Sequence, residues 1–222
     1  MNQKLKVIVT GSTGMVGEGV LHECLNSDKI ESVLIINRKP SGYSHPKLKE
    51  IIHADFFDFT AIETQLSGYN ACFFCLGISS VGVKKDDYFK FTYGLTMHVA
   101  EVLSSQNANM IFNYVSGAGT DSSEKGFSGW ARVKGKTEND LMKLPFKKVY
   151  AFRPGMIKPT EGLKHTHKFY NYIGWIFPIG RALFPSGFCT MKELGQAMIK
   201  TVTKGYPKNV IEGKDIIQLA KS

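Results

Sequence analysis

The sequence predicts an α/β fold, in which helices cover both faces of a doubly wound parallel sheet. Two observations predict this fold. Short apolar runs alternate with segments of helical spacing along residues 4–152, which is the pattern of repeated strand–helix units. The apolar runs are also nearly continuous, as expected for central parallel strands that are covered on both sides.

The first unit has an apolar run at residues 5–9, a glycine turn, a helical pattern to about residue 26 and a second apolar run at 33–36. Further strands are expected at 48–53, 70–76, 110–115 and 148–152. Helices are expected at 60–66, 87–105, 128–143 and 191–203, with Thr60 as the cap of the first. A late strand is expected within residues 209–218. This alternation favours parallel strand pairing.

Three spaced glycines follow the first apolar run, and each has its own expected role. Gly11 permits a tight turn, Gly14 lets the backbone approach a pyrophosphate, and Gly17 allows close packing of the helix on the sheet. The helix then points its free N–H groups at the phosphates. This pattern predicts a Rossmann fold and a dinucleotide site. The residues between these glycines are expected to contact the cofactor: Ser12, Thr13, Met15 and Val16.

The end of the second strand indicates which dinucleotide is bound. An acidic residue there would bind the ribose hydroxyl of NAD, but this sequence has Asn37, Arg38 and Lys39. Arg38 can pair with a 2′-phosphate and stack on adenine, so NADP(H) is expected over NAD(H). Asp55 and Phe56 follow the third strand, where the adenine edge is usually met. The alternative for Asp55 is a loop acid that caps the next helix.

The chain resembles the short-chain dehydrogenase/reductase superfamily in its extended or atypical branch, and within it the small Tat-interacting-type oxidoreductases. The resemblance covers about residues 4–157 and rests on the glycine motif, on Ser116 after the fifth strand, on Lys134 in the next helix and on the Arg153-Pro154-Gly155 run. It implies NADPH binding, with Ser116 holding a substrate oxygen and Lys134 holding the nicotinamide ribose. Further cofactor contacts are expected at strand ends: Cys75, Leu76, Gly77, Pro154, Gly155 and Met156.

Trp130 stands where the family has its catalytic tyrosine, four residues before Lys134. The spacing keeps both side chains on one helix face, but an indole N–H does not titrate in water and cannot serve as a general acid. Thr92 is a second departure, since the extended branch often has asparagine there.

Three interpretations of Trp130 follow. The protein is a carbonyl reductase of unknown substrate whose proton comes from Tyr88, Tyr93, His98, Cys75 or a water held by Ser116 and Lys134. Alternatively, it binds NADPH without turnover, as a sensor or regulatory protein. In the third interpretation the helix register differs, and Tyr114 or Tyr150 takes the tyrosine place, although both lie in expected strands.

The composition and net charge indicate the class of protein and limit the kinds of partner that are expected. With 43% hydrophobic and 21% charged residues, the chain is typical of a globular protein. Its net charge of +9 fits an anionic cofactor. Nucleic acid is not expected as a partner, because no nucleic-acid-binding signature accompanies the charge. Lys4 and Lys6 leave no room for a signal peptide, and the apolar region 169–184 is too broken to span a bilayer, so a cytoplasmic location is expected. The protein is expected to be a monomer or a homodimer.

The chain is expected to form one domain over residues 1–222, in which residues 158–222 make an aromatic-rich cap on the substrate side; the alternative is that its rings serve as core or as a dimer face. The rings are Phe169, Tyr170, Tyr172, Trp175, Phe177, Phe184 and Phe188. His165 and His167 have a spacing that some metal sites use, but no other ligand is near, so a solvated loop and no metal are expected. Cys72 and Cys75 lie on a strand-like run and are expected as free thiols.

Overall fold

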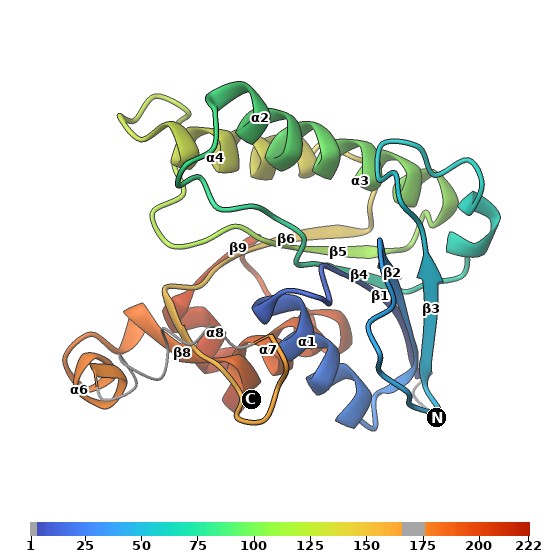
Figure 1. Cartoon of the computed structure of the whole chain (residues 1–222). Coiled ribbons are helices and arrows are strands. Elements are labelled where there is room, and N and C mark those ends of the chain that lie inside the picture. Colours follow the sequence, from blue (N-terminus) through green and yellow to red (C-terminus); the bar gives the residue numbers. More distant parts are fainter. Residues whose placement is uncertain (1–3, 166–175) are drawn as a thin grey trace.

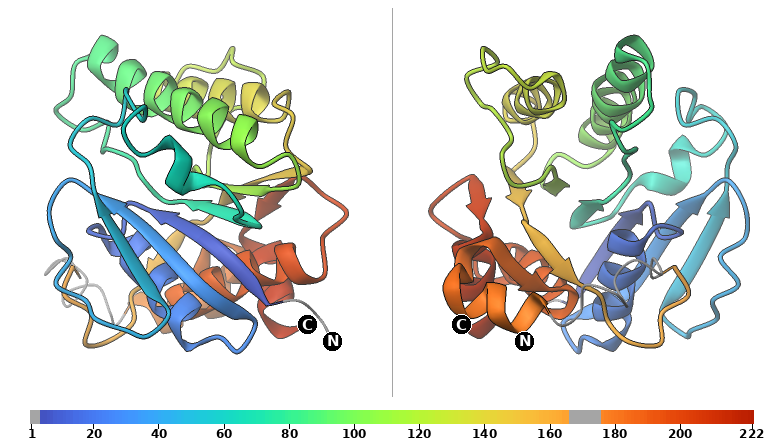
Figure 2. Two further views of the ribbon diagram at one scale, coloured as in Figure 1. Left: turned by 90° about the vertical axis from the view of Figure 1, so that its right-hand side faces the viewer. Right: turned by 60° about the vertical axis from the view of Figure 1, so that its left-hand side comes forward.

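A computed structural model describes residues 4–165 and 176–222 of the chain. Its centre is a seven-stranded parallel sheet with the strand order β3-β2-β1-β4-β5-β6-β9. Helices α2, α3 and α4 lie on one face of the sheet, and α1, α7 and α8 lie on the other (Figures 1 and 2). The predicted doubly wound parallel sheet is therefore confirmed.

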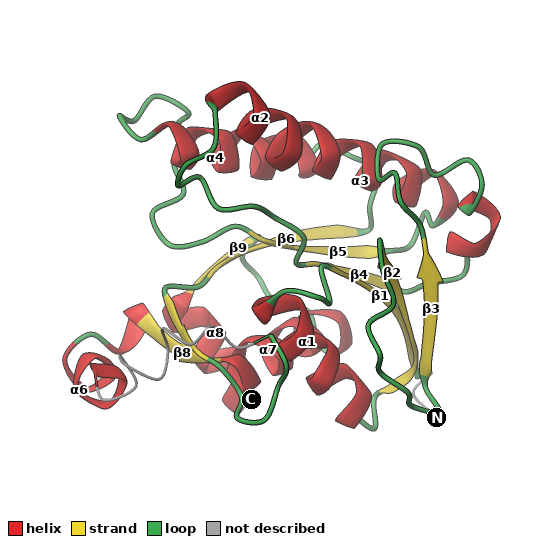
Figure 3. Cartoon of the chain, in the orientation of Figure 1, coloured by secondary structure: helices red, strands yellow, loops and turns green. Residues whose placement is uncertain are grey.

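The elements follow the predicted alternation of strands and helices (Figure 3). The strands of the main sheet are β1 (Leu5–Thr10), β2 (Ile30–Asn37), β3 (Leu48–Ile52), β4 (Ala71–Phe74), β5 (Ile111–Val115), β6 (Lys148–Arg153) and β9 (Val210–Glu212). The helices are α1 (Met15–Asn26), α2 (Lys85–Phe89), α3 (Leu95–Gln106), α4 (Gly129–Leu141), α6 (Ile176–Leu183), α7 (Met191–Thr203) and α8 (Gly213–Lys221).

Some local features differ from the sequence prediction. The expected helix at 60–66 is a short 3-10 turn, Glu63–Leu66, whose capping position is Ile62 rather than Thr60. The expected helix at 87–105 is divided into α2 and α3 by a π turn, Lys90–Gly94. Two short strands, β7 (Met156–Lys158) and β8 (Phe188–Thr190), form a second sheet that the sequence pattern did not indicate. Strands of three residues are too short to show a hydrophobic period.

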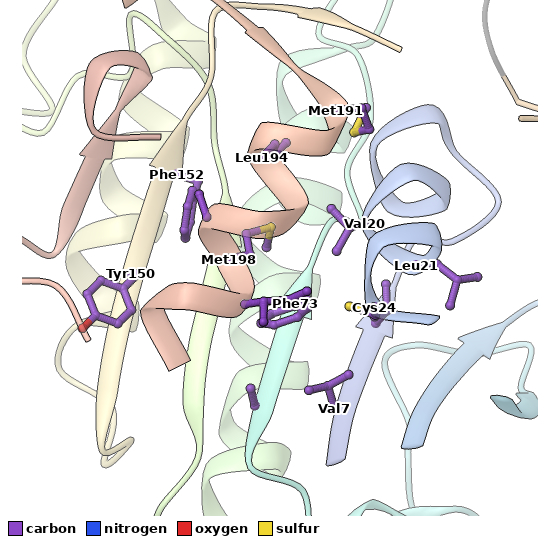
Figure 4. Close-up of a cluster of buried hydrophobic side chains, with 14 of the residues drawn as sticks. Val7, Val20, Leu21, Cys24, Phe73, Tyr150, Phe152, Met191, Leu194 and Met198 are labelled. Carbon is purple, nitrogen blue, oxygen red and sulfur yellow. The ribbon is translucent and has the colours of Figure 1, made fainter. Parts of the chain in front are cut away.

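The strands are apolar throughout because each contributes to two cores. Val7 and Val9 of β1 face the layer of α1, α7 and α8, whereas Ile8 faces α3 and α4. In the same way Phe73 of β4 and Phe74 point to opposite layers. Figure 4 shows the first core, in which side chains of α1 and α7 meet those of the strands. This alternation explains why sequence periodicity indicated fully covered strands.

The cysteines are all free. Cys72 belongs to the core under α3 and α4, and Cys75 packs against the core on the opposite side of the sheet. Their side chains therefore cannot meet, as the strand geometry predicted.

The C-terminal segment contributes to the sheet as well as to its surroundings. Residues 191–221 form α7, β9 and α8, so they complete one helical layer and the edge of the sheet (Figure 1). Phe177, Phe184 and Phe188 lie in or beside α6 and β8, and the expected aromatic residues at 169–175 lie outside the described residues. Within the described ranges, no helix is long and apolar enough to cross a bilayer.

Phe73→Ala tests the two-sided core, because Phe73 is fully buried in β4. Loss of its ring should lower the free energy of unfolding by about 3–5 kcal/mol in urea denaturation. Phe127→Ala is the matched control, since Phe127 is fully exposed, and it should change stability by less than about 0.5 kcal/mol. Equal effects of the two substitutions would contradict the assigned packing.

Candidate functional site

The loop between β1 and α1 is built on close backbone contacts. Gly11 has a φ of +71°, and a Cβ there would lie 2.7 Å from the carbonyl oxygen of Cys75, which follows β4. A Cβ on Gly17 would lie 2.1 Å from the carbonyl oxygen of Gly11. At Gly14, which caps α1, the nearest atom would be 3.5 Å away. The fold therefore requires the first and third glycines, whereas the space at the second is open.

The role of Gly17 is more local than the sequence predicted. It lets α1 pack against the glycine loop itself, and not directly against the sheet. Ser12 is fully buried beside it, and Met15 and Val16 form the first turn of α1. The N–H groups of this first turn have no partner within the helix, so they are available to an anion.

A pocket of about 170 Å³ lies beyond the carboxyl ends of β1, β2 and β4. In a parallel sheet this is the place where the strand order reverses and where ligands bind. Eight residues expected at the cofactor line it, namely Gly11, Thr13, Asn37, Arg38, Asp55, Phe56, Leu76 and Gly77. Six further residues of the lining were not predicted: Ile36, Ala54, Phe57, Ile78, Phe91 and Leu95.

Phe57 and Phe91 give the pocket an aromatic wall. Their ring centroids are 6.1 Å apart, and the ammonium group of Lys90 lies 5.4 Å from the first centroid and 5.8 Å from the second. Phe91 sits in the π turn, a helix irregularity that is often found at functional sites. Helical spacing placed Phe91 on an apolar helix face, but it could not show that the π turn brings this ring to the pocket.

The end of β2 carries a buried hydrogen-bond chain. The Ser12 hydroxyl donates to Oδ1 of Asn37 at 2.9 Å, and the Asn37 amide donates to Oε1 of Glu50 at 2.8 Å. The same Glu50 oxygen accepts the N–H of Ser41 at 2.9 Å. Ser12 and Asn37 therefore hold the loop through their side chains. No acidic residue stands at the end of β2 in the sequence, and Glu50 could not be expected there because it comes from the neighbouring strand β3.

Arg38 lines the pocket, Lys39 follows it in the chain, and both residues are exposed. Within residues 4–165 and 176–222, neither side chain takes part in a hydrogen bond or an ion pair. Asp55 is also exposed, but its Oδ1 accepts the N–H of Phe57 at 2.8 Å, so it shapes the turn after β3. The Phe56 ring is buried against Phe59, with centroids 5.5 Å apart. Of these two cations, Arg38 is the one that lines the pocket.

Ser116 follows β5 and is only 6% exposed. Its hydroxyl donates to Oε1 of Glu138 at 2.5 Å and lies 3.1 Å from the carbonyl oxygen of Phe152. The Ser116 carbonyl oxygen accepts a hydrogen bond from the ammonium group of Lys134. A serine hydroxyl has a single proton to donate. In this arrangement the hydroxyl donates its hydrogen bond to Glu138 and not to a substrate oxygen. This differs from the role that the family resemblance implied for Ser116.

Glu138 is the charged residue of the site that the sequence argument missed. It is fully buried and makes two hydrogen bonds with Arg153, from Nε at 3.1 Å and from the terminal guanidinium nitrogen. Arg153 also pairs with Glu212 of β9 at 3.2 Å. A sequence signal was present, since Glu138 follows Lys134 by four residues and shares its helix face.

Trp130 lies in the first turn of α4, and the same helix includes Lys134. A Cβ at Gly119 would be 3.5 Å from the Trp130 ring, so the indole covers the loop after β5. Tyr114 is buried in β5, and the Tyr150 hydroxyl hydrogen-bonds to the backbone of residue 206. Neither tyrosine occupies the place of Trp130, so the third interpretation is wrong.

Two of the candidate proton donors are engaged elsewhere. The Tyr93 hydroxyl donates to Oδ2 of Asp140 at 2.9 Å. The His98 ring packs edge-on against Phe59, with centroids 6.2 Å apart, in the core under α3. The Tyr93 hydroxyl is therefore committed to Asp140, and the His98 ring is part of the core packing.

The remaining donors differ in acidity. Burial raises the pKa of the Cys75 thiol, which makes it a weaker acid. Burial also raises the pKa of Tyr88. By contrast, burial lowers the pKa of Lys134 to about 8, although the Glu138 carboxylate opposes this shift. Lys134 thus exchanges its proton closer to neutral pH than an ordinary lysine does.

Gly155 and Met156 connect the main sheet to the small one. The carbonyl of Pro154 accepts the N–H of Ala118 at 2.8 Å, and a Cβ on Gly155 would lie 2.3 Å from the carbonyl oxygen of Gly187. Met156 begins β7, which pairs with β8. This run therefore brings the β7–β8 sheet close to the loop that follows Ser116.

Glu18 in the first turn of α1 is 1% exposed and joins two loops. It accepts the Tyr43 hydroxyl and the backbone N–H groups of Lys164 and His165, each of these two at 2.7 Å. The His165 ring faces the same carboxylate at 3.3 Å, and His167 lies outside the described residues. Within residues 4–165 and 176–222, no three His, Cys, Asp or Glu residues form a group that could hold a metal ion.

A larger groove, of about 700 Å³, lies between α1 and α7 near the start of β2. Its lining includes the lysines 29, 192, 200 and 204 together with Glu23 and Asp28. It is remote from the glycine loop, so the smaller pocket, where the glycine loop and Arg38 meet, is the candidate site.

These features define a dinucleotide-binding protein of the short-chain dehydrogenase/reductase type. The model of the NAD dependent epimerase/dehydratase family matches residues 7–125, more than half of the chain, and the protein belongs to this family.

Several known proteins are similar to this chain in sequence or in structure. The mitochondrial protein FMP52 of Debaryomyces hansenii is 26% identical over 69% of this chain and 67% of its own length. The protein HTATIP2 of Rattus norvegicus is 23% identical over 70% of this chain and 64% of its own. A short-chain dehydrogenase family protein from Francisella tularensis shares the fold, with a TM-score of 0.64 and 16% identity over 91% of this chain and 93% of that one.

The predicted cytoplasmic location is wrong by this comparison. FMP52 relatives from several fungi, which match this chain at 22–27% identity, are named mitochondrial proteins. The prediction depended on the missing space for a signal peptide before the first strand. That observation concerns secretion alone and does not distinguish the compartments inside a cell.

The glycines give a test of the loop that needs no ligand. Gly17→Ala places a methyl group against the backbone of Gly11 and should lower the free energy of unfolding by at least about 2 kcal/mol in urea denaturation. Gly14→Ala is the control and should lower it by less than about 1 kcal/mol, since the nearest atom is 3.5 Å away. The reverse order of effects would contradict the assigned loop geometry.

Proposed function

We propose that this protein binds NADP(H) in the pocket beyond β1, β2 and β4. The observation that carries the proposal is the convergence of the glycine loop, the N-terminus of α1 and the free Arg38 at that pocket. The residues fit a dinucleotide, because the open space at Gly14 leaves room for a pyrophosphate and the first turn of α1 offers it N–H donors.

In this proposal the adenosine half occupies the pocket between the Phe57–Phe91 wall and the backbone of residues 76–78. Arg38 pairs with the 2′-phosphate. The Glu50 carboxylate on β3 accepts hydrogen bonds from Asn37 and Ser41. At the other end Lys134 donates to the nicotinamide ribose.

We further propose that the protein is an NADP(H)-dependent oxidoreductase that acts on a carbonyl substrate. A bound NADPH supplies the hydride for such a reduction. The protein must supply the proton for the resulting alkoxide, and the ammonium group of Lys134, with its pKa near 8, is the described group best suited to do so directly or through a water molecule. The Trp130 ring lies against Gly119 of the neighbouring loop.

The alternative function is an NADPH-binding sensor without turnover, and a specific observation favours it as well. The Ser116 hydroxyl donates its hydrogen bond to Glu138, and the Trp130 indole does not titrate. Two of the three catalytic positions of the family therefore lack a proton donor that faces a substrate. Binding of the cofactor needs neither group.

Arg38→Ala tests the cofactor assignment. Loss of one charged contact to the 2′-phosphate should weaken NADPH binding by about 10- to 100-fold in calorimetric titration, while NADH binding stays within about threefold. Lys49→Ala on the outer face of β3 removes the same charge away from the pocket and should change neither affinity. Unchanged NADPH affinity in Arg38→Ala would refute the assignment.

NADPH consumption over a panel of aldehydes and ketones distinguishes the oxidoreductase from the sensor. We expect slow turnover that falls about 10²-fold or more in Lys134→Ala and rises in Trp130→Tyr. Lys136→Ala is the matched control, because Lys136 pairs with Asp140 on the same helix, and it should keep the native rate. Tight NADPH binding without turnover in both the native protein and Trp130→Tyr would refute the oxidoreductase and leave the sensor.

A further inference from the structure

Three residues of α4 follow each other at intervals of four: Trp130, Lys134 and Glu138. At this spacing their side chains lie along one face of the helix. That face is directed toward the sheet, since Glu138 is fully buried and Lys134 is half-buried. A cation and an anion are therefore held side by side beneath the candidate site.

Ser116 connects these two charges. Its carbonyl oxygen accepts the Lys134 ammonium group, and its hydroxyl donates to Oε1 of Glu138 at 2.5 Å. Because Ser116 directly follows β5, this single residue fixes both side chains relative to the sheet.

The Glu138 carboxylate is itself immobilised. Arg153 of β6 binds both of its oxygens and is only 11% exposed. Arg153 also donates to the Ser122 hydroxyl and to Glu212 of β9. The position of Glu138 is thus set by three strands, through Ser116, Arg153 and Glu212.

We propose that Glu138 is a positioning residue of the site, which fixes the Lys134 ammonium group through Ser116 and keeps it positively charged despite its burial. The contact of Lys134 with a ribose rests on the proposed function, but the effect of Glu138 on Lys134 does not.

The electrostatic surroundings support this role. Burial disfavours the charged form of Lys134, and the nearby Glu138 carboxylate favours it. The other charged neighbours of Glu138 are Arg153 and, beyond it, Glu212. Tyr114 of β5 is titratable, but burial, with Tyr88 and Glu138 nearby, raises its pKa, so it stays neutral. Without Glu138, the cation of Arg153 would act on Lys134 with no anion between them.

The test is the pH dependence of Lys134 acylation by an amine-reactive reagent, followed by mass spectrometry on the protein without cofactor. In the native protein the midpoint should be near pH 8, and in Glu138→Gln it should fall by about one pH unit or more. Asp140→Asn is the matched control: it removes a carboxylate of the same helix that pairs with Lys136 and Lys143, and it should leave the midpoint unchanged. An unchanged midpoint in folded Glu138→Gln would overturn the proposal.

Glu138→Gln leaves the buried Arg153 with fewer partners and can fail to fold. Ser116→Ala is the second variant, because it removes the hydroxyl link between Ser116 and Glu138 but keeps the Glu138–Arg153 pair and the backbone carbonyl that accepts a hydrogen bond from Lys134. The limiting rate of Lys134 acylation at high pH should rise several-fold when this link is lost, and an unchanged rate would overturn the positioning role. If the acylation measurements change as expected but the protein binds no NADPH, the proposed function is refuted and the role of Glu138 stands.

Discussion

The buried carboxylate of Glu138 is the group on which the Ser116–Lys134 half of the candidate site depends. It ties α4 to the ends of β5 and β6, and through Arg153 it reaches β9. A buried anion is costly unless it is paired and hydrogen-bonded. This requirement explains why Ser116 and Arg153 turn inward and why Lys134 has a fixed position. The chemistry available at the carboxyl ends of these strands follows from this internal constraint.

The same constraint separates cofactor binding from catalysis in this protein. The glycine loop, the pocket and Arg38 belong to the first half of the sheet and depend on backbone geometry. The groups that would move a proton belong to the second half, where one hydroxyl is committed to Glu138 and an indole stands in the tyrosine place. In the proposed complex Lys134 connects the two halves through the nicotinamide ribose, and we infer that its charge depends on Glu138.

Much of this arrangement could be predicted from the sequence, because local patterns record it. Apolar runs located the main strands to within a few residues, apart from the late strand β9, and the glycine spacing located the loop, since Gly11 and Gly17 meet backbone atoms that exclude any side chain. The missed residues depend on contacts across the chain. Glu50 reaches Asn37 from the neighbouring strand, and Phe91 reaches the pocket through a π turn. Ser116 lies where the family resemblance placed it, but no sequence pattern shows which way a hydroxyl donates.

A crystal structure of the protein with bound NADPH would test the central claim most directly. The account predicts that the 2′-phosphate lies on Arg38, that the nicotinamide ribose lies on the Lys134 ammonium group, and that the Ser116 hydroxyl still donates to Glu138. A nicotinamide bound away from Lys134, or a Ser116 hydroxyl turned from Glu138 toward the cofactor, would contradict it.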